Sequence, residues 1–183
     1  MRYDLLLRII GLRTMKTIHI ILSPELTDLC TLQSRKPPHL HNLSFDMRPR
    51  GLDVSELPVL LGSLKDLNIL DLRYCAIGDY GVLILSETFK SNTTLVDLIL
   101  RSNGIDNAGA CALSEALKVN KTLLTLDLQF NMVGHKGAVA LAEALKVNRT
   151  LKYLDLKHNA IGGSGVFALS KALKVNKIVA LNR

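Results

Sequence analysis

Acidic, basic and aromatic residues recur at fixed positions in four segments of the chain, which follow one another at equal spacing. In three of them an Asp is followed two residues later by Arg73, Gln129 or Lys157, and Tyr74 and Phe130 come next to these positions. Aromatic side chains beside Arg are typical of protein-binding hot spots. The pattern therefore predicts a protein-binding surface, with a solvated, self-neutralising face as the alternative. The predicted binding residues are Ile69, Asp71, Arg73, Tyr74, Asp97, Arg101, Asp127, Gln129, Phe130, Tyr153, Asp155, Lys157 and His158.

Motifs for catalysis or metal binding do not occur in the sequence at a suitable spacing. His39 and His41 lie close together, but no acidic or thiol partner has metal-ligand spacing. The three cysteines, Cys30, Cys75 and Cys111, form no paired motif, and the glycines are single rather than grouped in a phosphate-binding loop. We therefore expect a protein that is not an enzyme and that uses no metal ion or cofactor.

The elements that must position the predicted surface follow from a repeat. Units begin at Leu67, Leu95, Leu123 and Leu151, and a constant period of about 28 residues is typical of a solenoid. Each unit opens with LxxLxL, in which alternate leucines lie on one face of a short strand. A polar residue follows, and we expect its side chain to form a buried hydrogen-bonded ladder along the solenoid. This column holds Cys75, Asn103, Asn131 and Asn159.

The second half of each unit predicts a helix, because the apolar residues change from a period of two to one of about 3.6. A Gly recurs near the helix start, where a missing Cβ allows close packing. An Asn follows the helix and suits a left-handed residue that ends it. The Gly column is Gly81, Gly109, Gly137 and Gly165, and the Asn column is Asn92, Asn120, Asn148 and Asn176. Strands joined by helices lie parallel, and helices need more room than strands, so the stack curves with its strands inside.

The sequence thus predicts an α/β fold, a curved solenoid with parallel strands on the concave face and helices on the convex face. The run LxxLxLxxN, followed by GAxALAEALKVN, resembles the ribonuclease-inhibitor-like subclass of right-handed leucine-rich-repeat solenoids, which also occurs in NLR receptors and Ran GTPase-activating protein. The resemblance is specific over residues 67–177 and implies a non-enzymatic protein-interaction scaffold. It leaves open a GTPase-activating regulator, in which Arg73 or Arg101 would reach the nucleotide. Ribonuclease inhibition fits badly, because basic ribonucleases favour acidic partners.

The repeat also divides the chain. We expect residues 1–39 to form an N-terminal cap or a degenerate repeat, and residues 40–183 to form the repeat domain. Its units are 40–66, 67–94, 95–122, 123–150 and 151–177, with a partial unit at 178–183. No polar cap follows the partial unit, so we expect either a piece of a longer solenoid or an end that meets another chain. Leu169, Leu173 and Leu181 would be uncovered there, and this end would fray or self-associate.

The net charge of +7 lies in two columns near the helix ends, where cations interact favourably with the helix dipole. Without interleaved aromatic residues, these columns predict a solvated ridge and no nucleic-acid groove. They are Lys90, Lys118, Lys146 and Lys174, and Lys121, Arg149 and Lys177. Charges also interrupt the apolar run from Leu5 to Leu22, so we expect no membrane span. Unpaired cysteines indicate a reducing compartment, and we predict a cytoplasmic protein.

Overall fold

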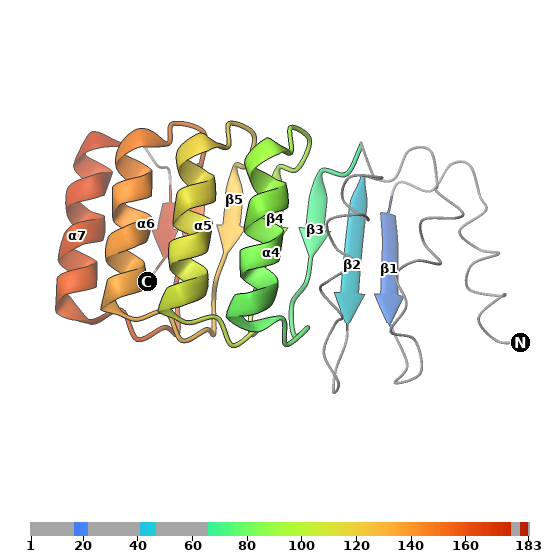
Figure 1. Ribbon diagram of the computed structural model, residues 1–183, viewed down its shortest axis with the longest axis horizontal. Coiled ribbons are helices and arrows are strands. Elements are labelled where there is room, and N and C mark those ends of the chain that lie inside the picture. The colour runs from blue at the N-terminus through green and yellow to red at the C-terminus, as the bar shows by residue number, and fades with distance from the viewer. Residues whose placement is uncertain (1–16, 22–40, 47–65, 177–179, 183) are drawn as a thin grey trace, which may run out of the picture.

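The computed structural model describes residues 17–21, 41–46, 66–176 and 180–182. Most of the predicted unit 40–66, His39, Cys30 and Lys177 lie outside them. Seven parallel strands pair in chain order in one sheet, and helices connect the later strands (Figure 1). The strands are β1 (Thr17–Ile21), β2 (Asn42–Asp46), β3 (Ile69–Asp71), β4 (Asp97–Ile99), β5 (Thr125–Asp127), β6 (Tyr153–Asp155) and β7 (Ala180–Asn182). The helices are α4 (Gly78–Ser91), α5 (Asn107–Val119), α6 (His135–Val147) and α7 (Gly162–Val175).

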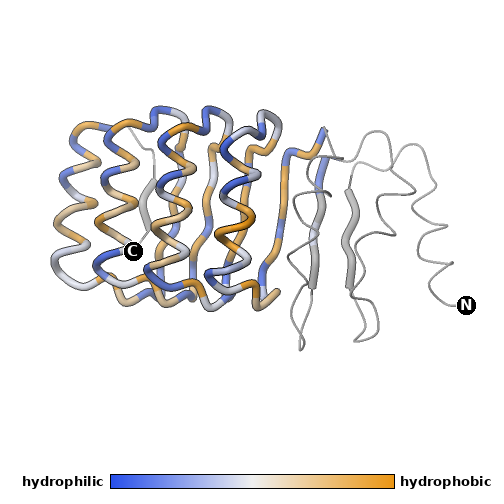
Figure 2. The backbone as a smooth tube through the Cα atoms, in the orientation of Figure 1, coloured by the Kyte–Doolittle hydropathy of each residue, from blue (hydrophilic) through white to orange (hydrophobic). Residues whose placement is uncertain are grey.

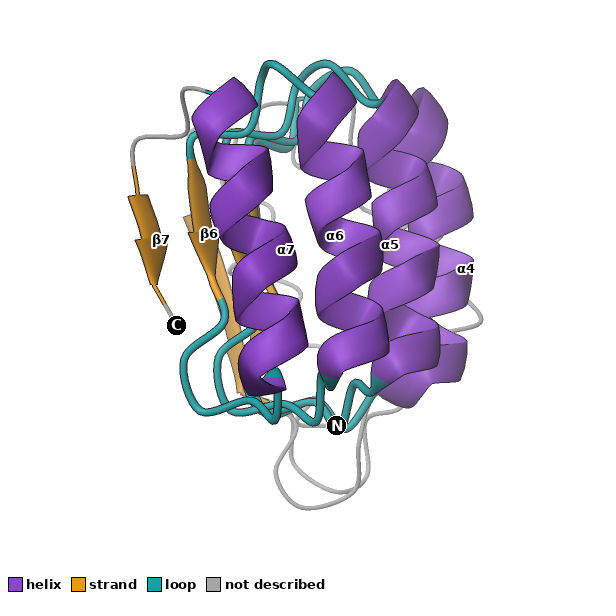
Figure 3. Ribbon diagram, turned by 90° about the vertical axis from the view of Figure 1, so that its left-hand side faces the viewer, coloured by secondary structure: helices purple, strands orange, loops and turns teal. Residues whose placement is uncertain are grey.

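The predicted alternation of parallel strands and helices is confirmed. The four helices stand in a row along one face of the sheet, which gives two layers (Figure 3). We call the outer side of this row the helix face and the opposite side of the sheet the strand face. The register repeats with the sequence: Leu70 pairs with Leu98, Leu98 with Leu126, and Leu126 with Leu154. Equivalent residues of successive units therefore form straight columns across the molecule.

Leucines fill the space between the two layers. In the unit that begins at Leu95, the side chains of Leu98, Leu100, Leu113 and Leu117 are completely buried. Each contributes about 1.5–3 kcal/mol by leaving water. Apolar and polar stretches alternate along the strands and helices, as the period of the sequence requires (Figure 2). The core is therefore a stack of similar leucine layers.

The prediction that Leu169 is uncovered is wrong. Leu169 in α7 is completely buried, like Leu113 and Leu141 at the same position of the two preceding helices. Its side chain therefore belongs to the layer between helices and sheet. Leu173 is only half-buried, whereas Leu145, at the same position of α6 and followed by a further helix, is completely buried. Among the described elements, no helix follows α7 to cover Leu173. The side chain of Leu181 lies outside the described residues.

The recurrent Gly does allow close packing of neighbouring helices, as predicted. A Cβ atom added at Gly137 would lie 2.8 Å from the Cβ of Ala110 on α5. A Cβ at Gly165 would lie 2.9 Å from the Cβ of Ala138 on α6 and 2.5 Å from Cγ2 of Ile161. These distances are too short for carbon atoms, so a larger residue would push the helices apart.

The predicted ladder of Asn side chains is present. The Oδ1 atom of Asn131 accepts hydrogen bonds from the main-chain N–H groups of Asn103 and Ile105, at 3.0 and 3.1 Å. Its Nδ2 atom donates to the carbonyl of Leu100 at 3.0 Å. Asn103 accepts in the same way from the N–H of Cys75 at 3.1 Å. Each Asn thus satisfies main-chain groups of the preceding unit and ties two units together.

We expect Asn131→Ala to lower the free energy of unfolding by about 1–3 kcal/mol, because buried N–H groups lose their acceptor. Asn131→Cys should cost less, since Cys75 already occupies the same column. Urea unfolding followed by circular dichroism measures both variants. An unchanged unfolding midpoint for Asn131→Ala would contradict the structural role of the ladder.

The second Asn column differs from the prediction, because its residues are not left-handed. All four, Asn92, Asn120, Asn148 and Asn176, have an extended backbone. The backbone N–H of Asn148 donates to the carbonyl of Ala144 at 2.9 Å, while its side chain bonds the following turn and the preceding unit. Oδ1 of Asn148 accepts from the N–H groups of Thr150 and Leu151 at 2.9 and 2.8 Å, and Nδ2 donates to the carbonyl of Leu117 at 2.7 Å. The prediction of a left-handed backbone at this position is therefore wrong. The Asn side chain instead forms hydrogen bonds that link two successive units.

Candidate protein-recognition surface

The strand face consists of residues that alternate with the buried leucines of β3–β6. Its members lie side by side because the register places equivalent residues in columns. One column is Ile69, Asp97, Thr125 and Tyr153, and the next is Asp71, Ile99, Asp127 and Asp155. The other predicted binding residues follow directly after the strands. The structure therefore brings the predicted residues together on one side of the solenoid.

The Asp residues of this surface hold the turns that end their strands. Asp127 accepts a hydrogen bond from the N–H of Gln129 at 2.8 Å, and Asp155 accepts one from Lys157 at 3.0 Å. Asp155 also accepts a bond from the hydroxyl of Tyr153 at 2.7 Å. A buried carboxylate needs such partners, and Asp155 is only 1% exposed. The Asp side chains therefore stabilise the turns that follow β5 and β6.

Asp71 forms an ion pair with Arg73, as expected for the alternative of a self-neutralising face. Its carboxylate contacts the guanidinium of Arg73 at 2.6 Å, and a second bond from Nε measures 2.9 Å. The hydrogen bond that Arg73 donates to Asp71 raises the pKa of Arg73 above its ordinary value, although burial opposes the increase. Arg73 is therefore held beside the end of its own strand. Its positive charge and the negative charge of Asp71 neutralise each other in this part of the surface.

Three side chains from successive units stack at the ends of β4–β6. The rings of Phe130 and His158 lie 4.0 Å apart between centroids, with 24° between their planes. The guanidinium carbon of Arg101 lies 4.5 Å from the centroid of the Phe130 ring. Such a cation–π contact stabilises by about 0.5–1 kcal/mol when exposed. Phe130 remains 43% exposed, so part of its ring faces solvent.

Left-handed turns present this stack. Tyr74, Ser102, Phe130 and His158 occupy the same position of their units and have φ angles of 60°, 55°, 54° and 58°. This conformation is uncommon for residues with a Cβ and is found where surrounding structure enforces it. Here the N–H of Phe130 bonds to the carbonyl of Lys157 at 3.0 Å, and the N–H of Ser102 bonds to Gln129 at the same distance. The turns of successive units are thus held in register.

Arg101 has unused hydrogen-bonding capacity. Its Nε atom is buried and has no hydrogen-bond partner in the part of the chain that the structure describes. An unsatisfied buried donor costs about 1–3 kcal/mol. A ligand group that reached this atom would remove that cost.

Asp127 lies in a surrounding that disfavours its charge. Burial raises the pKa of Asp127 above the ordinary value of 3.8, and the nearby charge of Asp155 adds to the increase. Hydrogen bonding from Gln129 opposes it. For a carboxyl group whose folded pKa is raised, the stabilising contribution is complete below the unfolded pKa and is lost as the pH rises through the folded value.

Asp127→Asn is therefore expected to make the protein modestly more stable at pH 7, while the amide oxygen still accepts from Gln129. The gain should disappear at about pH 3, where the carboxyl group is protonated in both states. Thermal melting of both proteins at the two pH values measures this. A gain of equal size at both would show that charge is not its cause.

Met132, in the turn after β5, is a large exposed apolar residue that was missed from the sequence. It lies two residues after Phe130 and is 59% exposed. The equivalent residues of the other units are small: Ala76, Gly104 and Ala160. That contrast within one column was the available signal. A large exposed apolar side chain beside an aromatic residue is typical of binding surfaces.

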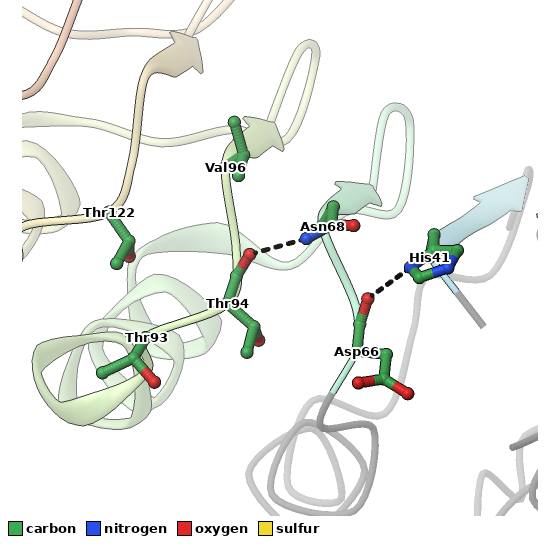
Figure 4. A pocket seen from close by; sticks show the side chains of 7 residues that line it. All are labelled: His41, Asp66, Asn68, Thr93, Thr94, Val96 and Thr122. Atoms are coloured by element: carbon green, nitrogen blue, oxygen red, sulfur yellow. Dashed lines mark hydrogen bonds between the residues drawn. The ribbon is translucent and has the colours of Figure 1, made fainter. Parts of the chain in front are cut away.

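A shallow pocket of about 410 Å³ lies at the other end of the strands (Figure 4). The ring of His41 is hydrogen-bonded to the carbonyl of Asp66 at 3.0 Å, and Nδ2 of Asn68 donates to the carbonyl of Thr94 at 3.0 Å. These polar groups thus bind the protein's own main chain. The lining residues are His41, Asp66, Asn68, Thr93, Thr94, Val96 and Thr122. None of them forms a nucleophile–base pair, so the pocket suggests no reaction.

The described residues contain no group of three or more His, Cys, Asp or Glu side chains that could hold a metal ion. Within the same ranges, every helix is too short or too polar to cross a lipid bilayer.

Comparisons with known proteins agree with this fold. The profile of the family described as "Leucine Rich repeat" matches residues 63–85, 91–114, 119–142 and 147–170. No curated protein matches the chain.

Among solved structures, "Leiomodin-1 Actin-Binding Site 2 (ABS2)" is 24% identical, with a TM-score of 0.60, over 70% of this chain and 75% of that one. The C-terminal domain of tropomodulin from Caenorhabditis elegans is 13% identical, with a TM-score of 0.59, over 96% of this chain and 93% of that one. These two similarities show the fold. Because the four segments that match the family profile cover more than half of its 183 residues, the chain belongs to the leucine-rich repeat family.

Proposed function

We propose that this protein is a non-enzymatic interaction scaffold that binds a protein partner through its strand face, the predicted concave face. The observation that carries the proposal is the stack of Arg101, Phe130 and His158. The stack is held by paired strands and by turns in register, so its side chains lose little freedom on binding. Preorganised aromatic and Arg side chains give affinity at low entropic cost.

The surface divides into two kinds of contact. Phe130, Tyr153 and Met132 provide apolar area that a partner can cover. Asp127 and Lys157 provide charges that fix the register of the partner and disfavour wrong partners. The remaining proposed contact residues are Ile69, Asp71, Arg73, Tyr74, Asp97, Arg101, Gln129 and His158. Asp155 was predicted as a contact, but its side chain is buried and holds the turn after β6, so we do not propose it.

The similar structures support a protein as the class of partner. The leiomodin-1 structure is described as an actin-binding site. At 24% identity and below, we propose only the partner's class. The subclass is proposed as ribonuclease-inhibitor-like, because each of the units that begin at Leu67, Leu95, Leu123 and Leu151 joins a short strand to an α-helix of 13 or 14 residues.

The GTPase-activating alternative has less support from the geometry. It requires an Arg that can reach a bound nucleotide. The guanidinium of Arg73 is already bound to Asp71, and that of Arg101 lies over Phe130. Hydrolysis assays with a panel of small GTPases would test this alternative directly.

Two smaller proposals accompany the function. A cytoplasmic location agrees with the free, exposed thiol of Cys111, because thiols persist in reducing compartments. Self-association through the C-terminal end is supported by Leu173, which is half-buried, whereas Leu117 and Leu145 at the same position are completely buried.

Site-specific photocrosslinking tests which face binds. A photoreactive amino acid is placed at position 130 on the strand face in one protein and at position 139 on the helix face in a second. A third protein, without the photoreactive amino acid, is the control. We expect crosslinks to a cellular protein from position 130 and not from position 139. Crosslinks from position 139 alone would refute strand-face binding.

A further inference from the structure

The helix face carries a row of ion pairs that repeats through three helices. Lys90 pairs with Glu87 at 2.7 Å on α4, and Lys118 pairs with Glu115 at 2.6 Å on α5. Lys146 pairs with Glu143 on α6 in the same way. In each pair the Lys follows the Glu by three residues, so both side chains lie on one side of the helix. The row is therefore neutral from α4 to α6.

Helix α7 breaks this pattern, because Lys171 stands where the other helices have Glu. Lys174 follows it at the usual spacing, and α7 contains no acidic residue. Within the described ranges, neither Lys171 nor Lys174 forms an ion pair. The last helix thus presents two positive charges at positions where its neighbours present a balanced pair.

An exposed aromatic side chain lies beside these charges. Phe167 is 61% exposed, and Nζ of Lys171 lies 4.5 Å from the centroid of its ring. Val175, at the end of the same helix, is 59% exposed. At the position of Phe167 the other helices carry Leu83, Cys111 and Val139. An aromatic ring and an uncompensated lysine pair therefore coincide on α7 alone among the four described helices.

We infer that Phe167, Lys171, Lys174 and Val175 form a second interaction surface, the α7 patch, which binds an acidic polypeptide segment carrying an apolar side chain. The two lysines are spaced like the Lys and Glu of the neighbouring pairs, so carboxylates of a partner can supply the missing acceptors. An apolar side chain of the same segment covers Phe167 and shields the new ion pairs from water. The surface is distinct from the strand face and does not depend on the proposed function.

A polypeptide fits this patch better than a lipid bilayer. Clusters of about 4–8 basic residues are typical of protein sites for anionic membranes, and the α7 patch has two lysines. The nearby basic residues of the α6–β6 loop are directed to the main chain: Arg149 donates to the carbonyl of Leu145 at 3.4 Å, and Lys152 donates to that of Arg149 at 3.4 Å.

Lys171→Glu is the decisive variant, because it restores the arrangement of the other helices. The probe is a fluorescein-labelled peptide of nine residues, with a central phenylalanine and four glutamates on each side. We expect Lys171→Glu to weaken its binding at least about tenfold, as loss of a central contact does. The melting temperature should stay the same or rise, since a Glu–Lys pair at this spacing stabilises a helix. Phe167→Ala should weaken binding to a similar extent.

Lys118→Glu is the matched control, since it changes the net charge equally on the same face of α5. It should leave peptide binding unchanged, and a peptide with lysines in place of the glutamates should not bind. Equal binding of the acidic peptide by wild type and Lys171→Glu would overturn the inference. Binding to vesicles that contain phosphatidylserine would also overturn it, if that binding depends on Lys171 and the peptide does not bind. So would a dimer, observed by sedimentation, that dissociates in the Lys171→Glu variant.

Discussion

Asn148→Ala is expected to lower the free energy of unfolding by about 3–5 kcal/mol, the largest effect of a single side chain that we predict. Asn148 is completely buried. Its Oδ1 atom accepts from the N–H groups of Thr150 and Leu151, and its Nδ2 atom donates to the carbonyls of Leu117 and Asn120. Ala would leave these main-chain groups without their side-chain partner in a region that excludes water. Buried polar groups without partners are costly.

Asn92→Ala is the matched control for this variant. Asn92 occupies the same column and accepts from Thr94 and Leu95, at 3.1 and 2.8 Å, but it is half-buried. Water can therefore replace its hydrogen bonds, and we expect a smaller loss of stability. Urea denaturation of both variants gives the comparison. A loss for Asn148→Ala no greater than that for Asn92→Ala would contradict the structural role of the second Asn column.

The double variant Phe130→Ala and Tyr153→Ala is expected to weaken binding of a protein partner by at least about 2 kcal/mol, or about 30-fold. Removing Phe130 takes away the ring that supports Arg101 and stacks on His158. Removing Tyr153 takes away the hydroxyl that bonds to Asp155. Both residues lie at the outer side of the sheet, and the core leucines do not change. The fold should therefore persist. The melting temperature falls because Asp155 loses a partner, so the affinities are compared at a temperature at which both proteins are folded.

Much of the fold was predictable because the sequence repeats. A constant period fixes the register, so one strand pattern predicts all of β3–β6. The Asn ladder followed from the same reasoning, since a polar residue at a buried, repeated position needs main-chain partners. The solvated ridge was predicted from its place near the helix ends, and its lysines do pair with glutamates on three helices.

Other features could not be predicted, because they depend on contacts between units. The stack of Arg101, Phe130 and His158 requires left-handed turns that direct side chains from three different units toward one another. The extended backbone of Asn148 depends on carbonyl groups that the preceding unit supplies. The burial of Leu169, by contrast, was predictable from its column, since Leu113 and Leu141 are buried at the same position. Periodicity predicts where residues lie, whereas side-chain direction depends on local backbone angles.

Strand-face binding is tested most directly by comparing two double variants with one partner. The partner is the protein that crosslinks at position 130, and the affinity is measured by titration calorimetry at fixed salt. The strand-face variant carries Phe130→Ala and Tyr153→Ala, and the helix-face variant carries Lys118→Glu and Lys146→Glu. We predict that the first loses at least about 30-fold in affinity and that the second changes it little. Loss of binding in the lysine variant, with binding retained in the aromatic variant, would contradict the account and place the partner on the helix face.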